Sequence, residues 1–252
     1  MTLVNITMKK NYKKIIALGA AFAVIATGTF SDSAFAVVRP NFCANLNQAV
    51  SLLDQRIITR EGVLKTRQNE RLQNLKNSRN LRDAKLTELK QNVITGLAPA
   101  YSKMEALAKT EGQKTAVNNF KIVMENAVSA RKNTVSAAAS DYRQEIDRII
   151  ALRNSAIDTA VRNFKNSNQA AVKKAKMDCV AEVRPLIART TFVASVRTAK
   201  SNLMSDKQKI GIPTPLVKSA SANYKNALTK ANQDFKTAAE KARIDLKVSF
   251  GK

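Results

Sequence analysis

Residues 141–171 read DYRQEIDRIIALRNSAIDTAVRNFKNSNQAA. Apolar residues recur in this stretch at intervals of three and four, the spacing of one face of an α-helix. The stripe consists of Tyr142, Ile146, Ile149, Ala156, Ala160, Phe164 and Ala171, with Arg153 and Ser167 at intervening core-type positions. Such a heptad stripe predicts an all-α fold, an elongated helical bundle or coiled-coil hairpins of about four to five helices.

Helical periodicity also precedes this stretch. A first long helix is predicted to end at a loop near 96–101, because Gly96 suits the position after a helix and Pro99 follows it as a stop. Ser102 and Glu105 have the spacing of a capping box, in which each side chain satisfies a free backbone N–H group at a helix start. We therefore expect a second helix to begin there.

The remaining helices follow Pro185, which disfavours helix at the residue before it. A second loop is predicted near 208–215, where one Gly and two Pro occur. The last helix carries a sustained apolar stripe from Leu216 to Leu246. Residues 190–194 are β-prone but lie inside a helical period, so a sheet is the minor alternative.

The N-terminal residues have the pattern of an export signal. Four lysines at positions 9, 10, 13 and 14 precede the apolar stretch 15–30, and Ala34-Phe35-Ala36 forms a small-x-small cleavage site. We expect cleavage after Ala36, which assigns residues 1–36 to a signal peptide and 37–252 to a single elongated helical domain. The predicted location is extracytoplasmic: periplasm, cell surface or medium. An uncleaved membrane anchor is the alternative, although the apolar run is short for a span.

The charge balance is strongly basic. The chain has 43 Lys and Arg, 19 Asp and Glu, and a formal net charge of +24. Such a surface attracts polyanions, and a solvated face that keeps the protein soluble is the alternative interpretation. The candidate polyanion-binding residues are Arg67, Arg71, Lys76, Arg79, Arg82, Lys173, Lys174 and Lys176.

Cys43 and Cys179 are the two cysteines of the chain. An even number of cysteines in an oxidising compartment favours an intrachain disulfide, and an interchain bond or free thiols remain alternatives. A catalytic cysteine is not expected, because the chain has no His to act as its base.

The sequence argues against an enzyme. No nucleophile elbow, phosphate-binding loop or dinucleotide fingerprint occurs. The absence of His and the wide separation of the cysteines argue against a metal site. Asp141 and Glu145 share a helix face but lie beside Arg143 and Arg148, which indicates ordinary helix ion pairing. We expect no cofactor and no small-molecule substrate.

Three functions fit these features. The first is a non-enzymatic structural or scaffold protein that associates with the cell envelope or its anionic polymers and can self-associate. The signal segment, basic charge and long thin-cored helices also resemble those of the Skp/OmpH family of periplasmic holdase chaperones, which implies helical arms around unfolded membrane proteins. This chain is longer, has two cysteines and lacks a clear β-rich body. The third is an extracellular protein that binds nucleic acid without sequence specificity.

Overall fold

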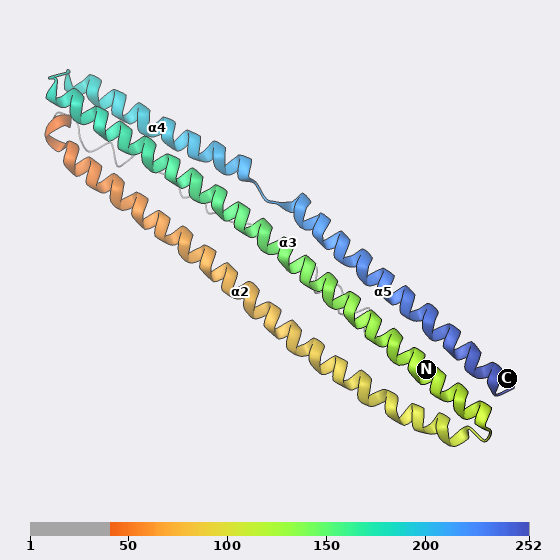
Figure 1. Ribbon diagram of the computed structural model, residues 1–252. Helices are drawn as coiled ribbons and strands as arrows, with labels where there is room; N and C mark the ends of the chain where they lie inside the picture. The colour runs from red at the N-terminus through yellow and green to blue at the C-terminus, as the bar shows by residue number, and fades with distance from the viewer. Residues whose placement is uncertain (1–40, 252) are drawn as a thin grey trace. The chain divides into compact units, whose positions relative to one another are not determined.

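A computed structural model describes residues 41–251, without the side chains of 89–96. The predicted signal peptide 1–36 lies outside the described residues. Four helices and no strand occur in the described part, which confirms the predicted all-α helical bundle. The helices are α2, Phe42–Leu107; α3, Glu111–Val180; α4, Pro185–Ile210; and α5, Thr214–Ser249 (Figure 1). The β-prone segment 190–194 lies inside α4.

The predicted loop near 96–101 is wrong, because α2 continues through Pro99 to Leu107. Proline removes one backbone hydrogen bond inside a helix. Two further turns of helix compensate for that loss, because they bury the Tyr101 side chain, whose ring lies 6.4 Å edge-on from the ring of Phe120. Ser102 is not an N-cap: its hydroxyl donates to the carbonyl of Ala98 within the helix.

The turn between α2 and α3 lies at residues 108–110, and its cap comes from Thr110 and Gln113. The Thr110 hydroxyl accepts a hydrogen bond from the Gln113 N–H, 3.2 Å away. The Gln113 side-chain oxygen accepts from the N–H groups of Lys109, 2.8 Å, and Thr110, 3.3 Å. This capping box satisfies N–H groups that the first turn leaves free, which explains why α3 begins here.

A tight turn at residues 181–184 joins α3 to α4. The Val183 N–H donates to the carbonyl of Asp178, 3.0 Å away, and Glu182 has a φ of 54°. This is the geometry of a Schellman C-cap with a glutamate at the left-handed position that glycine usually occupies. Pro185 then starts α4, where its missing N–H costs nothing.

The predicted loop near 208–215 is present as residues 211–213 between α4 and α5. Gly211 adopts a φ of 52°, and its N–H donates to the carbonyl of Lys207. The Arg153 guanidinium on α3 donates to the carbonyl of Gly211, 3.4 Å away. A cation at the end of α4 stabilises carbonyl groups that lack partners within the helix.

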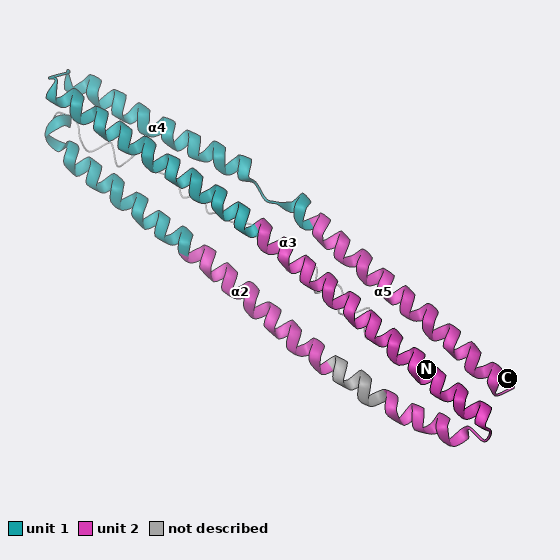
Figure 2. Ribbon diagram, viewed as in Figure 1, with its two compact units in different colours: residues 1–65, 150–217 teal, residues 66–149, 218–252 magenta. Residues whose placement is uncertain are grey.

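Contacts divide the described residues into two compact units, and α2 and α3 contribute to both (Figure 2). Unit 1 contains residues 41–65 and 150–217, so it combines the start of α2, the end of α3 and α4. Unit 2 contains residues 66–149 and 218–251, and therefore most of α5. Each unit is a three-helix bundle. The prediction of a single elongated domain over 37–252 stays a prediction.

The buried residues of α5 repeat every 11 positions. They are Ala220, Ala231 and Ala242. In α3 the heptad prediction placed Ser167 in the core, but Ser167 is exposed and its neighbour Asn168 is buried. An 11-residue repeat corresponds to about 3.67 residues per turn, close to a straight α-helix, and does not require the left-handed supercoil of a heptad.

Unit 1 has a continuous apolar core. Within this core the ring of Phe42 on α2 packs against the ring of Phe192 on α4, with centroids 5.8 Å apart. A disulfide joins Cys43 to Cys179, which confirms the intrachain pair and links the first turn of α2 to the last turn of α3. The core cluster consists of Phe42, Leu46, Leu53, Ile57, Phe164, Ala171, Ala175, Ala188, Phe192, Val196 and Ala199.

Unit 2 holds its helices together with aromatic and cationic contacts. Tyr142 on α3 stacks on Tyr224 on α5, with ring centroids 5.3 Å apart. Arg131 on α3 donates to the side chain of Asn232, 2.8 Å away, and its guanidinium lies 5.5 Å from the centre of the Phe235 ring. Arginine therefore packs α5 against α3 with both its charge and its planar face.

Candidate polyanion-binding surface

The first group of candidate cations lies on α2 in unit 2. Arg67 and Lys76 are exposed, whereas Arg71, Arg79 and Arg82 are half-buried. Successive residues turn by about 100° around a helix, which places Lys76 on the side of α2 opposite Arg67. The five side chains therefore do not form one face that could follow a phosphate backbone.

Arg79 forms contacts between helices inside the bundle. Its guanidinium donates to a carboxylate oxygen of Asp147 on α3, 2.9 Å away, and to the carbonyl of Arg143 at 3.4 Å. The Arg79 side chain is only 18% exposed. We conclude that Arg79 bridges α2 and α3 and is poorly placed to contact a polyanion.

Arg82 is partly occupied as well, because its Nε donates to the carbonyl of Ser78, one turn earlier on α2. The next residue, Asp83, forms an ion pair with Arg143 on α3. Sequence reasoning missed this pair. The available signal is an Arg-x-x-x-Asp motif on each helix, at 79–83 and 143–147. In an antiparallel pair of helices, each motif places its arginine opposite the other's aspartate.

Ion pairs on α3 shift the pKa values of the groups that form them. The hydrogen bond to Asp83 raises the pKa of Arg143 above its ordinary value, and partial burial opposes that rise. On the surface of α3, Arg148 donates to both carboxylate oxygens of Glu145 and so lowers the pKa of that carboxyl. The second pair agrees with the prediction of ordinary helix ion pairing at this site.

The second group of candidate cations lies near the end of α3 in unit 1, and all three side chains are exposed. Lys174 forms an ion pair with Asp178, one turn later, at 3.0 Å. Lys173 and Lys176 have no carboxylate partner among the described residues, and their spacing of three puts them on one face of α3. These two lysines are the candidates best placed to meet an external anion.

The two groups of candidates belong to different units: the five residues on α2 to unit 2 and the three lysines on α3 to unit 1. Of the eight predicted residues, Arg79 contributes to packing between helices, and Lys174 is neutralised locally. The chemistry available to the exposed remainder is electrostatic attraction of anionic groups by mobile, hydrated cations.

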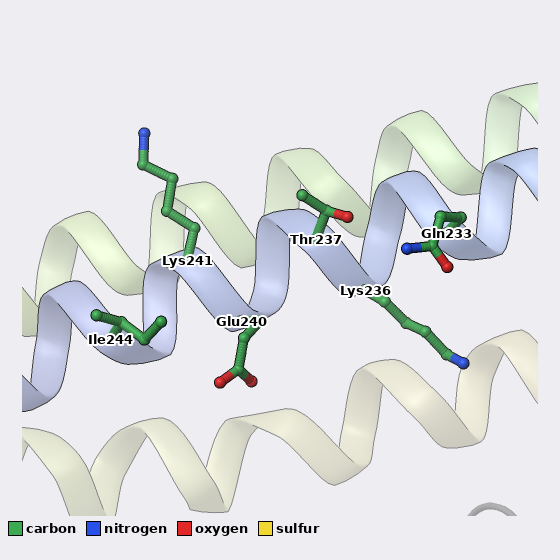
Figure 3. A pocket seen from close by; sticks show the side chains of 6 residues that line it. All are labelled: Gln233, Lys236, Thr237, Glu240, Lys241 and Ile244. Atoms are coloured by element: carbon green, nitrogen blue, oxygen red, sulfur yellow. The ribbon is translucent and has the colours of Figure 1, made fainter.

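Further cations line a pocket of about 460 Å³ on α5, which the prediction did not single out. Figure 3 shows that the side chains of Lys236 and Lys241 point in different directions. All six lining residues come from one helix, so the pocket lacks walls that converge on a ligand. The lining residues are Gln233, Lys236, Thr237, Glu240, Lys241 and Ile244.

The described part of the chain has neither a candidate membrane span nor a candidate metal site. None of its helices combines the length and apolar character that crossing a bilayer requires. In the same residues, no three or more His, Cys, Asp or Glu side chains gather where they could bind a metal ion.

Comparison with known proteins does not assign the chain to a family. No protein-family model, curated protein or solved structure matches it.

Proposed function

We propose that the mature protein, residues 37–252, is a non-enzymatic, extracytoplasmic helical scaffold that is held on anionic components of the cell envelope by its basic surface. The export-signal pattern of residues 1–36 supports an extracytoplasmic location. The Cys43–Cys179 disulfide is compatible with an oxidising compartment.

The exposure of Lys173 and Lys176 without carboxylate partners in the described residues carries the proposal. Residues 37–252 contain 39 Lys and Arg but 18 Asp and Glu, so internal ion pairs cannot neutralise most of the cations. Long-range attraction to anionic polymers or lipids follows from this excess. Attraction of this kind needs no shaped pocket.

A salt series tests the proposal. Oxidised residues 37–252 would be incubated with anionic vesicles, with lipopolysaccharide or teichoic acid, and with mixed-sequence duplex DNA. We expect binding to the envelope components at about 150 mM salt, weakening as screening increases. No binding at that salt concentration to any of these would reduce the charge to a solubility feature. Binding to DNA alone would favour the nucleic-acid function.

A second measurement separates the scaffold from a chaperone. A holdase should prevent aggregation of an unfolded outer-membrane protein, and capture of apolar segments should depend weakly on salt. We expect residues 37–252 to leave that aggregation unchanged. Salt-independent suppression of aggregation would replace the scaffold function with the Skp/OmpH-like function.

A further inference from the structure

The turn between α3 and α4 exposes an unusual set of apolar side chains. Four large apolar residues are solvent-exposed within eleven positions that flank the turn, and Val180 is 84% and Leu186 71% exposed. Exposed apolar side chains that occur singly need no explanation, but a group of them marks an interaction site. We call these four residues the apolar tip: Met177, Val180, Leu186 and Ile187.

Cations accompany the apolar tip. On α3, Lys173, Lys176, Met177 and Val180 follow the spacing of one helix face and lie within about 100° of each other around the axis. The core-facing residue Ala175 points the other way, because it is almost fully buried. The basic residues belong to the same exposed face as the apolar ones, and Arg184 adds an exposed cation in the turn itself.

The turn is also rigidly built. The disulfide at Cys179 fastens the last turn of α3 to α2, directly beside Val180. Glu182 holds the left-handed conformation of the C-cap, and Pro185 restricts the backbone where α4 begins. The apolar tip is therefore presented in a defined conformation, which lowers the entropic cost of binding a surface.

We propose that the apolar tip inserts into the headgroup region of an anionic lipid bilayer, while Lys173, Lys176 and Arg184 contact the lipid phosphates. This inference rests on the proposed envelope attachment and assigns it to one lipid-binding site. Charge complementarity selects the occupant: apolar side chains bordered by cations match an interface of acyl chains bordered by phosphates. The acidic residues near the turn do not neutralise these three cations. Asp178 already pairs with Lys174, so Glu182 is the exposed carboxylate near the turn.

The turn between α2 and α3 provides a comparison. Among the described side chains near that turn, Leu107 is exposed and large, whereas Tyr101 and Ala108 are buried. A single apolar residue does not form an insertion surface. The density of exposed apolar residues therefore distinguishes the α3–α4 turn from the other hairpin turn.

The chain contains no Trp, which permits a direct test with one introduced fluorophore. Leu186→Trp would report the environment of the apolar tip in residues 37–252. Ile58→Trp, on α2 of the same unit, is a matched control because Ile58 is 65% exposed and lies outside the tip. Both substitutions replace exposed apolar residues and should leave the fold intact.

We expect the emission of Leu186→Trp to shift to shorter wavelength with phosphatidylglycerol-containing vesicles and to be quenched by brominated acyl chains. Ile58→Trp should show neither change. Vesicle flotation in which the protein binds but Leu186→Trp does not respond would overturn insertion of the tip and leave the proposed envelope attachment standing. Binding to anionic polymers but not to vesicles would also overturn insertion of the tip and leave envelope attachment standing. No binding to either would overturn both the insertion of the tip and the proposed envelope attachment.

Two further variants separate the apolar and the electrostatic contributions to vesicle binding. Leu186→Gln should weaken binding to anionic vesicles by about tenfold, because it removes a large apolar side chain from the contact. Lys173→Gln with Lys176→Gln should weaken it by about fivefold for each charge and leave binding to phosphatidylcholine vesicles unchanged. Light scattering provides the last check: an oligomer that Leu186→Gln converts to a monomer would reassign the tip to self-association and overturn lipid insertion.

Discussion

Arg143 of α3 and Asp83 of α2 form a bidentate ion pair, in which two guanidinium nitrogens donate to the two carboxylate oxygens. The neighbouring pair, Arg79 with Asp147, exchanges the roles of the two helices and is joined by a hydrogen bond from one guanidinium nitrogen. Charged residues in the middle of α2 therefore lie opposite residues of opposite charge on α3. This polar region of α2 contributes to the register of the bundle through its ion pairs.

The first prediction concerns the energy of the Asp83–Arg143 pair. A double-mutant cycle with Asp83→Ala and Arg143→Ala should give a coupling free energy of about 1 kcal/mol in urea unfolding, because both side chains remain partly exposed. Arg143→Lys should lose most of this coupling free energy, since lysine lacks the planar guanidinium group that binds both carboxylate oxygens. Coupling near zero at low salt would show that the pair does not stabilise unit 2.

The second prediction concerns the disulfide, which spans 136 positions of sequence. Cys43→Ser with Cys179→Ser should lower the free energy of unfolding by about 4 kcal/mol, mainly because the unfolded chain regains the entropy of a closed loop. Wild-type protein unfolded with a reductant is the control and should match the variant. An unchanged urea midpoint on reduction would contradict the prediction.

The third prediction concerns Asn168, which is 1% exposed in the core of unit 1. Its side-chain nitrogen donates to the carbonyl of Phe164, 2.7 Å away, but its side-chain oxygen has no hydrogen-bond partner in the structure. Leucine has a similar branched shape, so Asn168→Leu should raise the free energy of unfolding by about 1 kcal/mol. Asn168→Asp should lower it, because it buries a charge. Destabilisation by both variants would indicate that the oxygen has an unseen partner such as water.

The fourth prediction concerns Tyr101 and alkaline pH. Burial, followed by the nearby charge of Glu125, raises the pKa of Tyr101 above its ordinary value of about 10. The folded state therefore keeps the phenol proton to higher pH than the unfolded state does. This group contributes stability that is present below about pH 10 and lost as pH rises through the folded pKa.

Tyr101→Phe should accordingly reduce the loss of stability above about pH 10 in thermal unfolding, while Tyr142→Phe serves as the matched control. At neutral pH, Tyr101→Phe should cost little, because the buried hydroxyl has no hydrogen-bond partner in the structure. An alkaline profile identical to that of wild type would argue that Tyr101 is not the titrating group.

The fifth prediction concerns Glu182, which has a φ of 54° at the C-cap of α3. Glycine adopts this conformation without strain, so Glu182→Gly should raise the melting temperature and add about 1 kcal/mol of stability. Glu182→Ala, which keeps the strain but removes the charge, is the control. Equal effects of the two variants would assign the gain to charge and not to backbone conformation.

Some features of the fold are predictable from the sequence, and others are not. The disulfide and the loop around Gly211 were predicted correctly, because each depends on residue types with few alternatives. The sequence predicts a capping box at Ser102, whereas the structure forms it at Thr110 and Gln113, which offer the same chemistry with Gln in place of Glu. The two motifs predict a helix start equally well. The structure uses the one at Thr110, because continuing α2 past Ser102 buries Tyr101.

The candidate site was less predictable than the fold. Exposure of Lys173 and Lys176 follows from their polarity, but the use of Arg79 within the bundle depends on Asp147, a residue on another helix. Likewise, the sequence shows that Val180 and Leu186 are apolar and cannot show that no helix covers them. Contacts between distant residues decide which charges and apolar groups reach the solvent.

The sequence by itself determined the all-helical composition, the net positive charge and the pair of cysteines, because these depend on residue type and local periodicity. Tertiary structure alone decided the 11-residue period of the buried alanines of α5, the choice of Asn168 over Ser167 as a core residue, and the exposed apolar turn between α3 and α4. The physical reason is that residues spaced by three and four fit a seven- or an eleven-residue repeat equally well over short stretches. The partner helices select one of the two by burying some faces and leaving others open.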